Sequence, residues 1–173
     1  MVIRVNRAPV MTLWAAVVAE HLGFDEDEAL TIGKTVAGLN AQAKGVRLGI
    51  YTPDPDRLMK ERKKPPTAEV LHVDVLHRAV PVVRTKEGLR ALSRDKPVSP
   101  DSVRRYLASK FKDELPAVKA AMEDLAGAFS HHELAANGYG LYEAFRPAIP
   151  AGVKGWGAAG DLDLAKLRAL APR

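Results

Sequence analysis

PVMTLWAAVVAEHLG, residues 9–23, is the stretch that decides the fold of this 173-residue chain. Apolar side chains occupy helical spacings along it, and alanines fill most of the positions between them. A helix that is apolar on nearly every side belongs in the centre of a core. Pro9 suits the first turn of such a helix, and Gly23 is the residue type that commonly ends one. The sequence therefore predicts a buried central helix against which the other elements pack.

A second helix is predicted over residues 25–43, with its end at Lys44-Gly45. Asp25 and Glu28 have the spacing of a capping box, and the four carboxylates of residues 25–28 lie at the positive end of the helix dipole. Helical spacing gives a core stripe of Ala29, Ile32, Val36, Leu39 and Ala43. It gives an opposite, polar arc of Thr31, Lys34, Thr35, Gly38 and Gln42. Asn40 falls inside the core stripe, where a buried amide needs hydrogen-bond partners.

The rest of the chain predicts short strands and further helices. Residues 69–83 are predicted to form a hairpin, with Pro81 placing its second strand at a sheet edge. Ser99-Pro100-Asp101 is a strong helix start, and residues 130–133 have the capping-box pattern. The other predicted elements are a strand over residues 46–51 and helices over residues 57–62, 86–92, 115–129 and 161–170.

These elements predict a mainly α fold with a small antiparallel β-hairpin, that is, an α+β protein with a compact helical core. Residues 63–66, Lys-Lys-Pro-Pro, have the composition of a linker. Residues 1–64 are accordingly interpreted as an N-terminal helical lobe, and residues 65–173 as the hairpin plus a C-terminal helical lobe. A single domain over residues 1–173 stays open, because this length suits one domain.

Composition excludes several kinds of site. The chain has no cysteine, so disulfides, zinc–thiolate sites and cysteine nucleophiles are excluded. The apolar run of residues 10–19 is about half of the roughly 20 residues that cross a bilayer. We therefore predict a cytoplasmic protein with no membrane partner.

Two motifs suggest dinucleotide binding and metal binding, but the surrounding sequence does not support either function. GWGAAG, residues 155–160, matches the dinucleotide-binding fingerprint, but no buried strand precedes it and too few residues follow it to supply the ribose-binding carboxylate. His131-His132-Glu133 suggests a metal site, as do His72 and His77, yet these spacings do not aim two imidazoles at one ion. A structural glycine turn and a helix cap explain the two motifs. No metal and no cofactor is predicted.

The remaining signal is basic charge. The net charge is +5. Residues 44–64 hold seven basic and three acidic side chains, and residues 84–112 hold nine and three, so these two stretches are strongly positive and the rest is negative. Such asymmetry favours anionic partners. The predicted function is binding of DNA or RNA, mainly through phosphates. The candidate residues are Arg57, Lys60, Arg62, Lys63, Lys64, Arg90, Arg94, Lys96, Arg104 and Arg105.

Two alternatives come from other classes of protein. One is a non-catalytic interaction or regulatory module, in which the glycine-flanked Trp156 and the terminal helix, within residues 147–173, dock on a second copy or another partner. The other is an enzyme of unknown type, which requires the fold to gather histidines into one pocket. A charged surface without any partner is also compatible with the composition.

Overall fold

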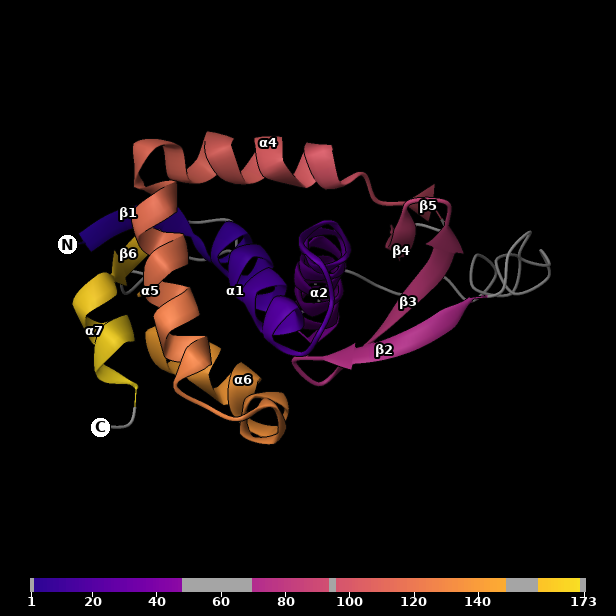
Figure 1. The fold of residues 1–173 in the computed structure, drawn as a ribbon. Helices are drawn as coiled ribbons and strands as arrows, with labels where there is room; N and C mark the ends of the chain where they lie inside the picture. Colours follow the sequence, from indigo (N-terminus) through magenta and orange to yellow (C-terminus); the bar gives the residue numbers. More distant parts are fainter. Residues whose placement is uncertain (1, 48–69, 94–95, 149–158, 172–173) are drawn as a thin grey trace.

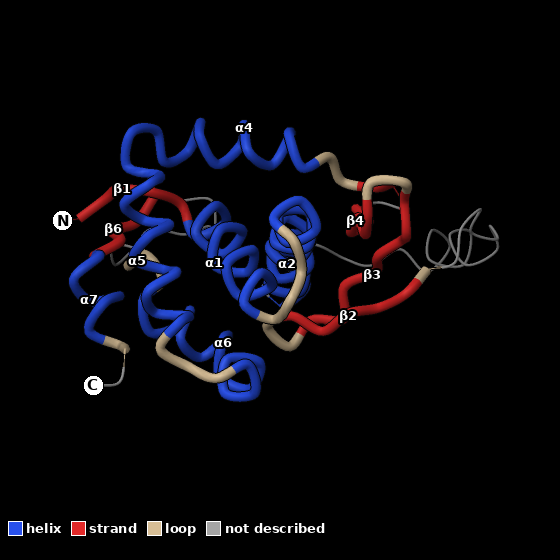
Figure 2. Tube along the Cα trace, in the orientation of Figure 1, coloured by secondary structure: helices blue, strands red, loops and turns tan. Residues whose placement is uncertain are grey.

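The computed structural model describes residues 2–47, 70–93, 96–148 and 159–171 (Figure 1). It has a mixed α+β fold in which two small antiparallel sheets pack against a helical core. This confirms the predicted fold class, and Figure 2 shows that helices make up most of the body. The helices are α1 Arg7–His21, α2 Glu26–Arg47, α4 Pro100–Phe111, α5 Leu115–Gly127, α6 His131–Phe145 and α7 Leu164–Ala169, with a 3-10 turn η1 Lys112–Glu114. The strands are β1 Val2–Asn6, β2 Leu71–Val75, β3 Arg78–Thr85, β4 Gly88–Ser93, β5 Lys96–Pro97 and β6 Ala159–Asp163.

Helix α1 is the centre of the core, as its apolar sequence predicts. Every residue from Pro9 to Ala19 is buried. The indole Nε1 of Trp14 donates a hydrogen bond of 2.9 Å to the carbonyl of Gly138 in α6. The Trp14 ring also makes an edge-to-face contact with Phe145, with centroids 5.3 Å apart. Because the indole has both an apolar environment and an acceptor, its burial leaves no polar group unsatisfied.

Helices α1 and α2 approach each other most closely at Gly33. A Cβ atom placed on Gly33 would lie 2.4 Å from the Thr12 carbonyl oxygen, so the backbones meet where a side chain cannot fit. The capping box predicted for α2 is present, with the Glu28 amide donating to Asp25 Oδ1 and the Asp25 amide to Glu28 Oε1. The helix runs past its predicted end to Arg47, so residues 46–47 are helical and not the start of a strand.

Side chains on one face of α2 bond to the backbone of strand β4, which pairs with β5 only at Leu92 and Ser93. Glu28 Oε2 accepts the Leu89 amide at 2.9 Å, Thr31 Oγ1 accepts the Ala91 amide at 3.0 Å, and Thr35 Oγ1 donates to the Leu92 carbonyl at 3.2 Å. Seven helical residues rise about 10.5 Å, and three strand residues span about 10 Å. The two lengths match, so side chains spaced along α2 can form hydrogen bonds with successive backbone groups of β4.

This pairing corrects the prediction for the polar arc of α2, which we expected opposite the core. Thr31 is fully buried and Thr35 is 6% exposed. Lys34, from the same arc, packs its ammonium group over the ring of Tyr106 in α4. Sequence polarity does not indicate solvent exposure here, because threonine hydroxyls serve as the hydrogen-bond partners of buried backbone groups.

The larger sheet has the strand order β2-β3-β4-β5, and all its pairs are antiparallel. The hairpin of β2 and β3 is confirmed. Two other predictions are wrong: β3 is an interior strand rather than an edge strand, and residues 88–93 form β4 rather than part of a helix. Pro81 is tolerated in β3 because the pairing with β4 begins one residue later, at Val82 opposite Ala91. Tertiary contacts to β3 and α2 outweigh the local helical signal of residues 86–92.

The smaller sheet joins the two ends of the described chain. Strand β1 pairs with β6, with Ile3 opposite Leu162. The sequence predicted a structural glycine turn at residues 155–160 and a helix over residues 161–170, whereas residues 159–163 form strand β6. Gly160 has to be a glycine because a Cβ atom there would lie 2.6 Å from the Ala148 carbonyl oxygen. The final helix begins later than predicted, after Asp163, whose carboxylate caps it.

Local start signals in the second half of the chain are confirmed. Ser99 caps α4, with Pro100 as its first residue, and Ser130 and Glu133 form the capping box of α6. Asn40 is half-buried and accepts hydrogen bonds from Arg78 and Tyr139, as a polar group in the core stripe must. The predicted helix over residues 57–62 and the predicted linker lie outside the described residues, so the division into two lobes stays a prediction.

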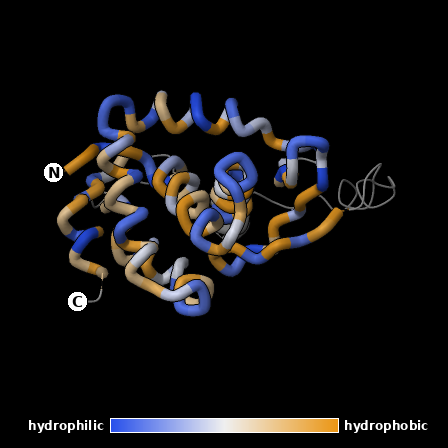
Figure 3. The backbone as a smooth tube through the Cα atoms, in the orientation of Figure 1, coloured by the Kyte–Doolittle hydropathy of each residue, from blue (hydrophilic) through white to orange (hydrophobic). Residues whose placement is uncertain are grey.

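No helix in the described ranges is both long and apolar enough to span a bilayer. In Figure 3, α4 alternates between hydrophobic and hydrophilic colours, as expected for a helix with a single face in the core. Val103, Leu107 and Phe111 supply that buried face.

Because Thr31 accepts a hydrogen bond from β4, we predict that Thr31→Val strongly lowers the stability of the protein. This isosteric change leaves the buried Ala91 amide without an acceptor, which should lower the free energy of unfolding by about 1–3 kcal/mol. Thr12→Val is the matched control, since the buried Thr12 hydroxyl donates only to the Ala8 carbonyl of its own helix, and it should cost less than about 1 kcal/mol. Urea unfolding of both variants tests this. Equal losses would contradict the assigned role of Thr31.

Replacing each of two glycines of α2 by alanine should change the free energy of unfolding in opposite directions. Gly33→Ala forces α1 and α2 apart and should cost about 3 kcal/mol. Gly38 is exposed and a Cβ atom there meets nothing within 4 Å, so Gly38→Ala should stabilise the protein by about 0.5–1 kcal/mol through helix propensity. Thermal and urea unfolding measure both changes. A tolerated Gly33→Ala would show that the two helices do not pack at this point.

Candidate phosphate-contact surface

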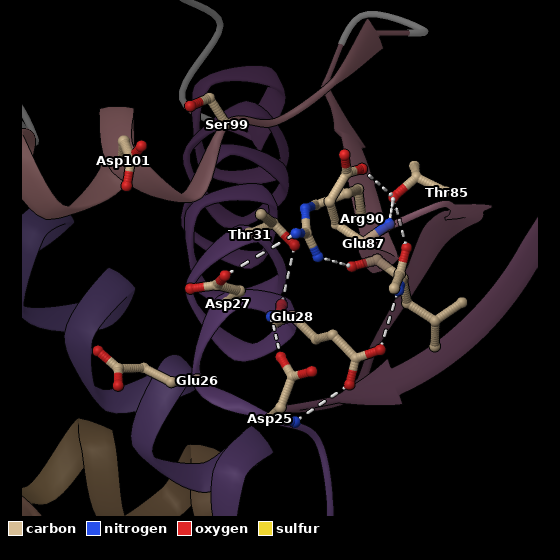
Figure 4. A network of polar contacts seen from close by, with 12 residues as sticks. Asp25, Glu26, Asp27, Glu28, Thr31, Thr85, Glu87, Arg90, Ser99 and Asp101 are labelled. Atoms are coloured by element: carbon tan, nitrogen blue, oxygen red, sulfur yellow. Dashed lines mark hydrogen bonds and ion pairs between the residues drawn. The ribbon is translucent and has the colours of Figure 1, made fainter.

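The acidic start of α2 binds one of the predicted site residues inside the protein. Arg90, on β4, is only 8% exposed. Its Nη1 donates to the Leu89 carbonyl at 2.8 Å, and its Nη2 lies 3.9 Å from Asp27 Oδ2 (Figure 4). Gly88 leaves room for this arrangement, because a Cβ atom there would meet both Glu28 and the Arg90 guanidinium. Arg90 therefore stabilises the fold and has little surface to offer a ligand.

Arg104, on α4, is held by three carboxylates. Its Nη1 donates to Asp101 at 2.9 Å, while its Nη2 contacts Asp27 and lies 3.5 Å from Glu26. The hydrogen bond with Asp27 is the main reason that the pKa of Arg104 is raised. Asp27 thus links two arginines, one from β4 and one from α4, to the start of α2. The charge of Arg104 is largely compensated within the protein.

The outward face of α4 carries cations without such compensation. Opposite its buried face the exposed side chains follow one another at spacings of three and four residues, which places them on one line along the helix. Neither Arg105, which lies on this line, nor Lys112, which directly follows the last residue of α4, has a carboxylate within ion-pairing distance among the described residues. Figure 1 shows α4 lying across the outside of the helical body, with no described element over its outer side. We call this surface the α4 ridge: Ser102, Arg105 and Ser109 on α4, with Lys112 at the C-terminal end of the helix.

Two lysines add positive charge beside the α4 ridge. The ammonium of Lys34 lies 3.7 Å from the centroid of the Tyr106 ring. Desolvation is the main reason that the pKa of Lys34 is lowered, and the nearby charge of Lys110 adds to it. Lys110 itself is exposed. The mutual repulsion shows that these two cations are close together, so an anion bound at this flank would relieve it.

The structure separates the ten predicted site residues into three groups. Arg90 and Arg104 bind carboxylates of the protein itself. Lys96 and Arg105 are exposed and have no ion-pair partner in the described part of the chain. Ser102, Ser109 and Lys34 were missed as site residues, although helical spacing from the predicted start of α4 would have aligned the two serines with Arg105. The remaining six lie outside the described residues: Arg57, Lys60, Arg62, Lys63, Lys64 and Arg94.

A separate cleft of about 310 Å³ lies between α1, the β2–β3 turn and α6. Its turn residues Leu76 and His77 have φ values of 51° and 62°, which are unusual for residues other than glycine. Leu76 is nevertheless buried against Gly138, and this packing holds the turn. Among the described residues, no cluster of three or more histidines and carboxylates could hold a metal ion. The cleft is lined by Val18, Leu22, Asp74, Val75, Leu76, His77 and Ala135.

No family model matches the sequence, and searches of curated proteins and of solved structures found no significant match. The chemistry available to the chain is therefore inferred from its own residues. The α4 ridge offers one guanidinium and two hydroxyl groups on α4, and one ammonium at the C-terminal end of the helix. These are the donors that commonly contact phosphate oxygens.

Because Asp27 binds both Arg90 and Arg104, we predict that Asp27→Asn destabilises the protein more than Glu26→Gln. Each change removes one charge from the first turn of α2, so the two lose the same interaction with the helix dipole. Asp27→Asn also deprives the buried Arg90 of its carboxylate and should cost about 2 kcal/mol. Glu26→Gln removes an exposed contact worth less than about 1 kcal/mol. Equal losses in urea unfolding would contradict the linking role of Asp27.

Proposed function

We propose that the protein binds nucleic acid, chiefly through contacts between phosphate groups and the α4 ridge. The observation that carries this proposal is the position of Arg105, exposed on the outer face of α4, and of Lys112, exposed at the C-terminal end of that helix; both are free of carboxylate partners in the described part of the chain. The helix is held in place on its opposite face by the core. The backbone that carries these cations does not need to be ordered by the ligand, which lowers the entropic cost of binding.

The spacing of the α4 ridge suits a chain of phosphates. Arg105 and Lys112 are seven residues apart, and the helical part of this segment, from Arg105 to Phe111, rises about 9 Å along the helix axis. Duplex DNA has one phosphate per 3.4 Å of rise along each strand, so this length corresponds to about three phosphates. Ser102 and Ser109 add hydroxyl donors along the same line. The α4 ridge can therefore contact several phosphates of one strand without bending it.

The composition of the α4 ridge indicates little base specificity. Base edges are usually read by arginine, asparagine or glutamine side chains from an element inserted in a groove. The α4 ridge has a single arginine and no amide side chain. The acidic start of α2, close to the first turn of α4, would also repel the phosphates that flank a deep groove. Contacts to one phosphate backbone, with affinity set by salt, fit this surface best.

The test is fluorescence anisotropy of a labelled random-sequence DNA duplex titrated at several salt concentrations. Arg105→Gln with Lys112→Gln removes two phosphate contacts, so the slope of log K against log salt should become shallower by about two. The control is Arg84→Gln with Lys166→Gln, which removes the same charge from exposed cations of β3 and α7. We expect the control to retain the slope of the wild type.

Three possible outcomes of these titrations bear on nucleic-acid binding by the α4 ridge. Loss of affinity confined to the variant of the α4 ridge supports the proposal. Equal weakening by both double variants would mean that only net charge matters, and the α4 ridge would then not be the contact surface. Absence of binding at low salt would overturn nucleic-acid binding altogether. A parallel titration with single-stranded RNA shows which nucleic acid the surface favours.

A further inference from the structure

Two arginines, Arg7 and Arg146, lie where α1 begins and α6 ends. Neither belongs to the α4 ridge. Arg7 is the first residue of α1, and its Nε donates to the Pro147 carbonyl at 3.0 Å. This bond uses the inner nitrogen of the guanidinium. Its two Nη groups have no acceptor among the described residues. The fork of Arg7 is thus fixed in position while its outer donors stay available.

The second arginine is fixed by the end of α6. Arg146 directly precedes Pro147, and its backbone amide donates to the Tyr142 carbonyl at 2.7 Å. Burial is the main reason that the pKa of Arg7 is lowered, and the charge of Arg146 lowers it further. Both side chains are half-buried. Two like charges are therefore held close together, and neither has a carboxylate within ion-pairing distance in the described ranges.

Tyr142 places a phenol beside the two guanidiniums. The residue is 2% exposed, and burial raises its pKa to about 12, while the charges of Arg146 and Arg7 act in the opposite direction. No described residue forms a hydrogen bond with its hydroxyl, although a buried phenol normally has a partner. No side-chain polar atom of the described residues is both fully enclosed and unpartnered. The hydroxyl is therefore not fully enclosed by the described residues, and both arginines are close enough to lower its pKa.

The surroundings of this cluster contain little negative charge. The first turn of α1 has no acidic residue, so the positive end of its dipole is not offset there. Of the effects on the Tyr142 hydroxyl, the negative charge of Glu143 is the smallest. Asp161, on β6, is the nearest carboxylate by register, because it lies opposite Arg4 of β1 and is also bridged to Ala148, but in the described ranges it forms no ion pair with Arg7 or Arg146. The cluster is thus positive and rich in donors.

We infer that Arg7, Tyr142 and Arg146 form a binding site for a dianionic oxyanion, in particular the phosphate group of a small ligand. Guanidinium forks match the oxygen pairs of such a group, and the phenol supplies a further donor to a third oxygen. An anion here would relieve the repulsion between the arginines and satisfy the Tyr142 hydroxyl. This inference does not depend on nucleic-acid binding by the α4 ridge.

Calorimetric titration with inorganic phosphate, at constant ionic strength set by chloride, tests the site. We expect saturable binding by the wild type, weakened at least tenfold by Arg146→Gln and several-fold by Tyr142→Phe. Arg146→Lys keeps the charge without the fork and should bind with intermediate affinity. Lys166→Gln, an exposed cation on α7, is the control and should bind as the wild type does. Arg7→Gln can also weaken the fold, so the result rests on the other variants.

Two results would overturn the inference. One is the absence of saturable phosphate binding by the wild type, and the other is unchanged affinity in both Arg146→Gln and Tyr142→Phe. DNA titrations of Arg146→Gln separate this site from the α4 ridge, because its salt slope should equal that of the wild type. Repeating the calorimetry with acetate shows whether a monoanionic carboxylate suffices, and equal affinity for acetate would contradict the preference for a dianion.

Discussion

The row formed by Glu28, Thr31 and Thr35 on α2 is the constraint on which the structure depends. These side chains take the place of a neighbouring strand along β4, and they can do so because seven residues of helix and three of strand have nearly the same length. Without them, buried amides of β4 would lack acceptors, each at a cost of about 1–3 kcal/mol. The sheet is therefore attached to the helical core by hydrogen bonds as well as by apolar packing.

This attachment also decides which cations face solvent. Once β4 lies against α2, Arg90 is brought to the acidic first turn, and Asp27 is in reach of Arg104 on α4 as well. The carboxylates that stabilise the helix dipole thus bind two arginines and orient α4 across the body. The opposite side of α4 is then turned outward with Arg105 and Lys112. The positive surface is a consequence of the way in which the protein uses its acidic residues internally.

Local signals in the sequence predict the helix starts well, since Asp25, Ser99 and Ser130 each cap within their own segment. Predictions fail where distant residues decide the structure. Residues 88–92 have no local reason to be extended, and they form most of strand β4 because β3 and α2 bind them. The pairing of β1 with β6 joins residues about 160 positions apart. The same limit applies to the site: Arg105 and Arg104 were both predicted to contact phosphates, and the ion pair that occupies Arg104 depends on a contact with Asp27 across 77 residues.

The two anion-binding surfaces that we propose differ in physical character. The α4 ridge presents long, exposed side chains whose charges are screened by salt, and such contacts give modest affinity spread over many phosphates. Arg7 and Arg146 are half-buried. The hydrogen bond from Arg7 Nε to the Pro147 carbonyl fixes the Arg7 guanidinium, and the bond from the Arg146 amide to the Tyr142 carbonyl fixes where the Arg146 side chain begins. Repulsion between buried like charges is a cost that folding bears and that a bound dianion removes. A site of this kind discriminates by charge and shape, so it suits one small group rather than a polymer.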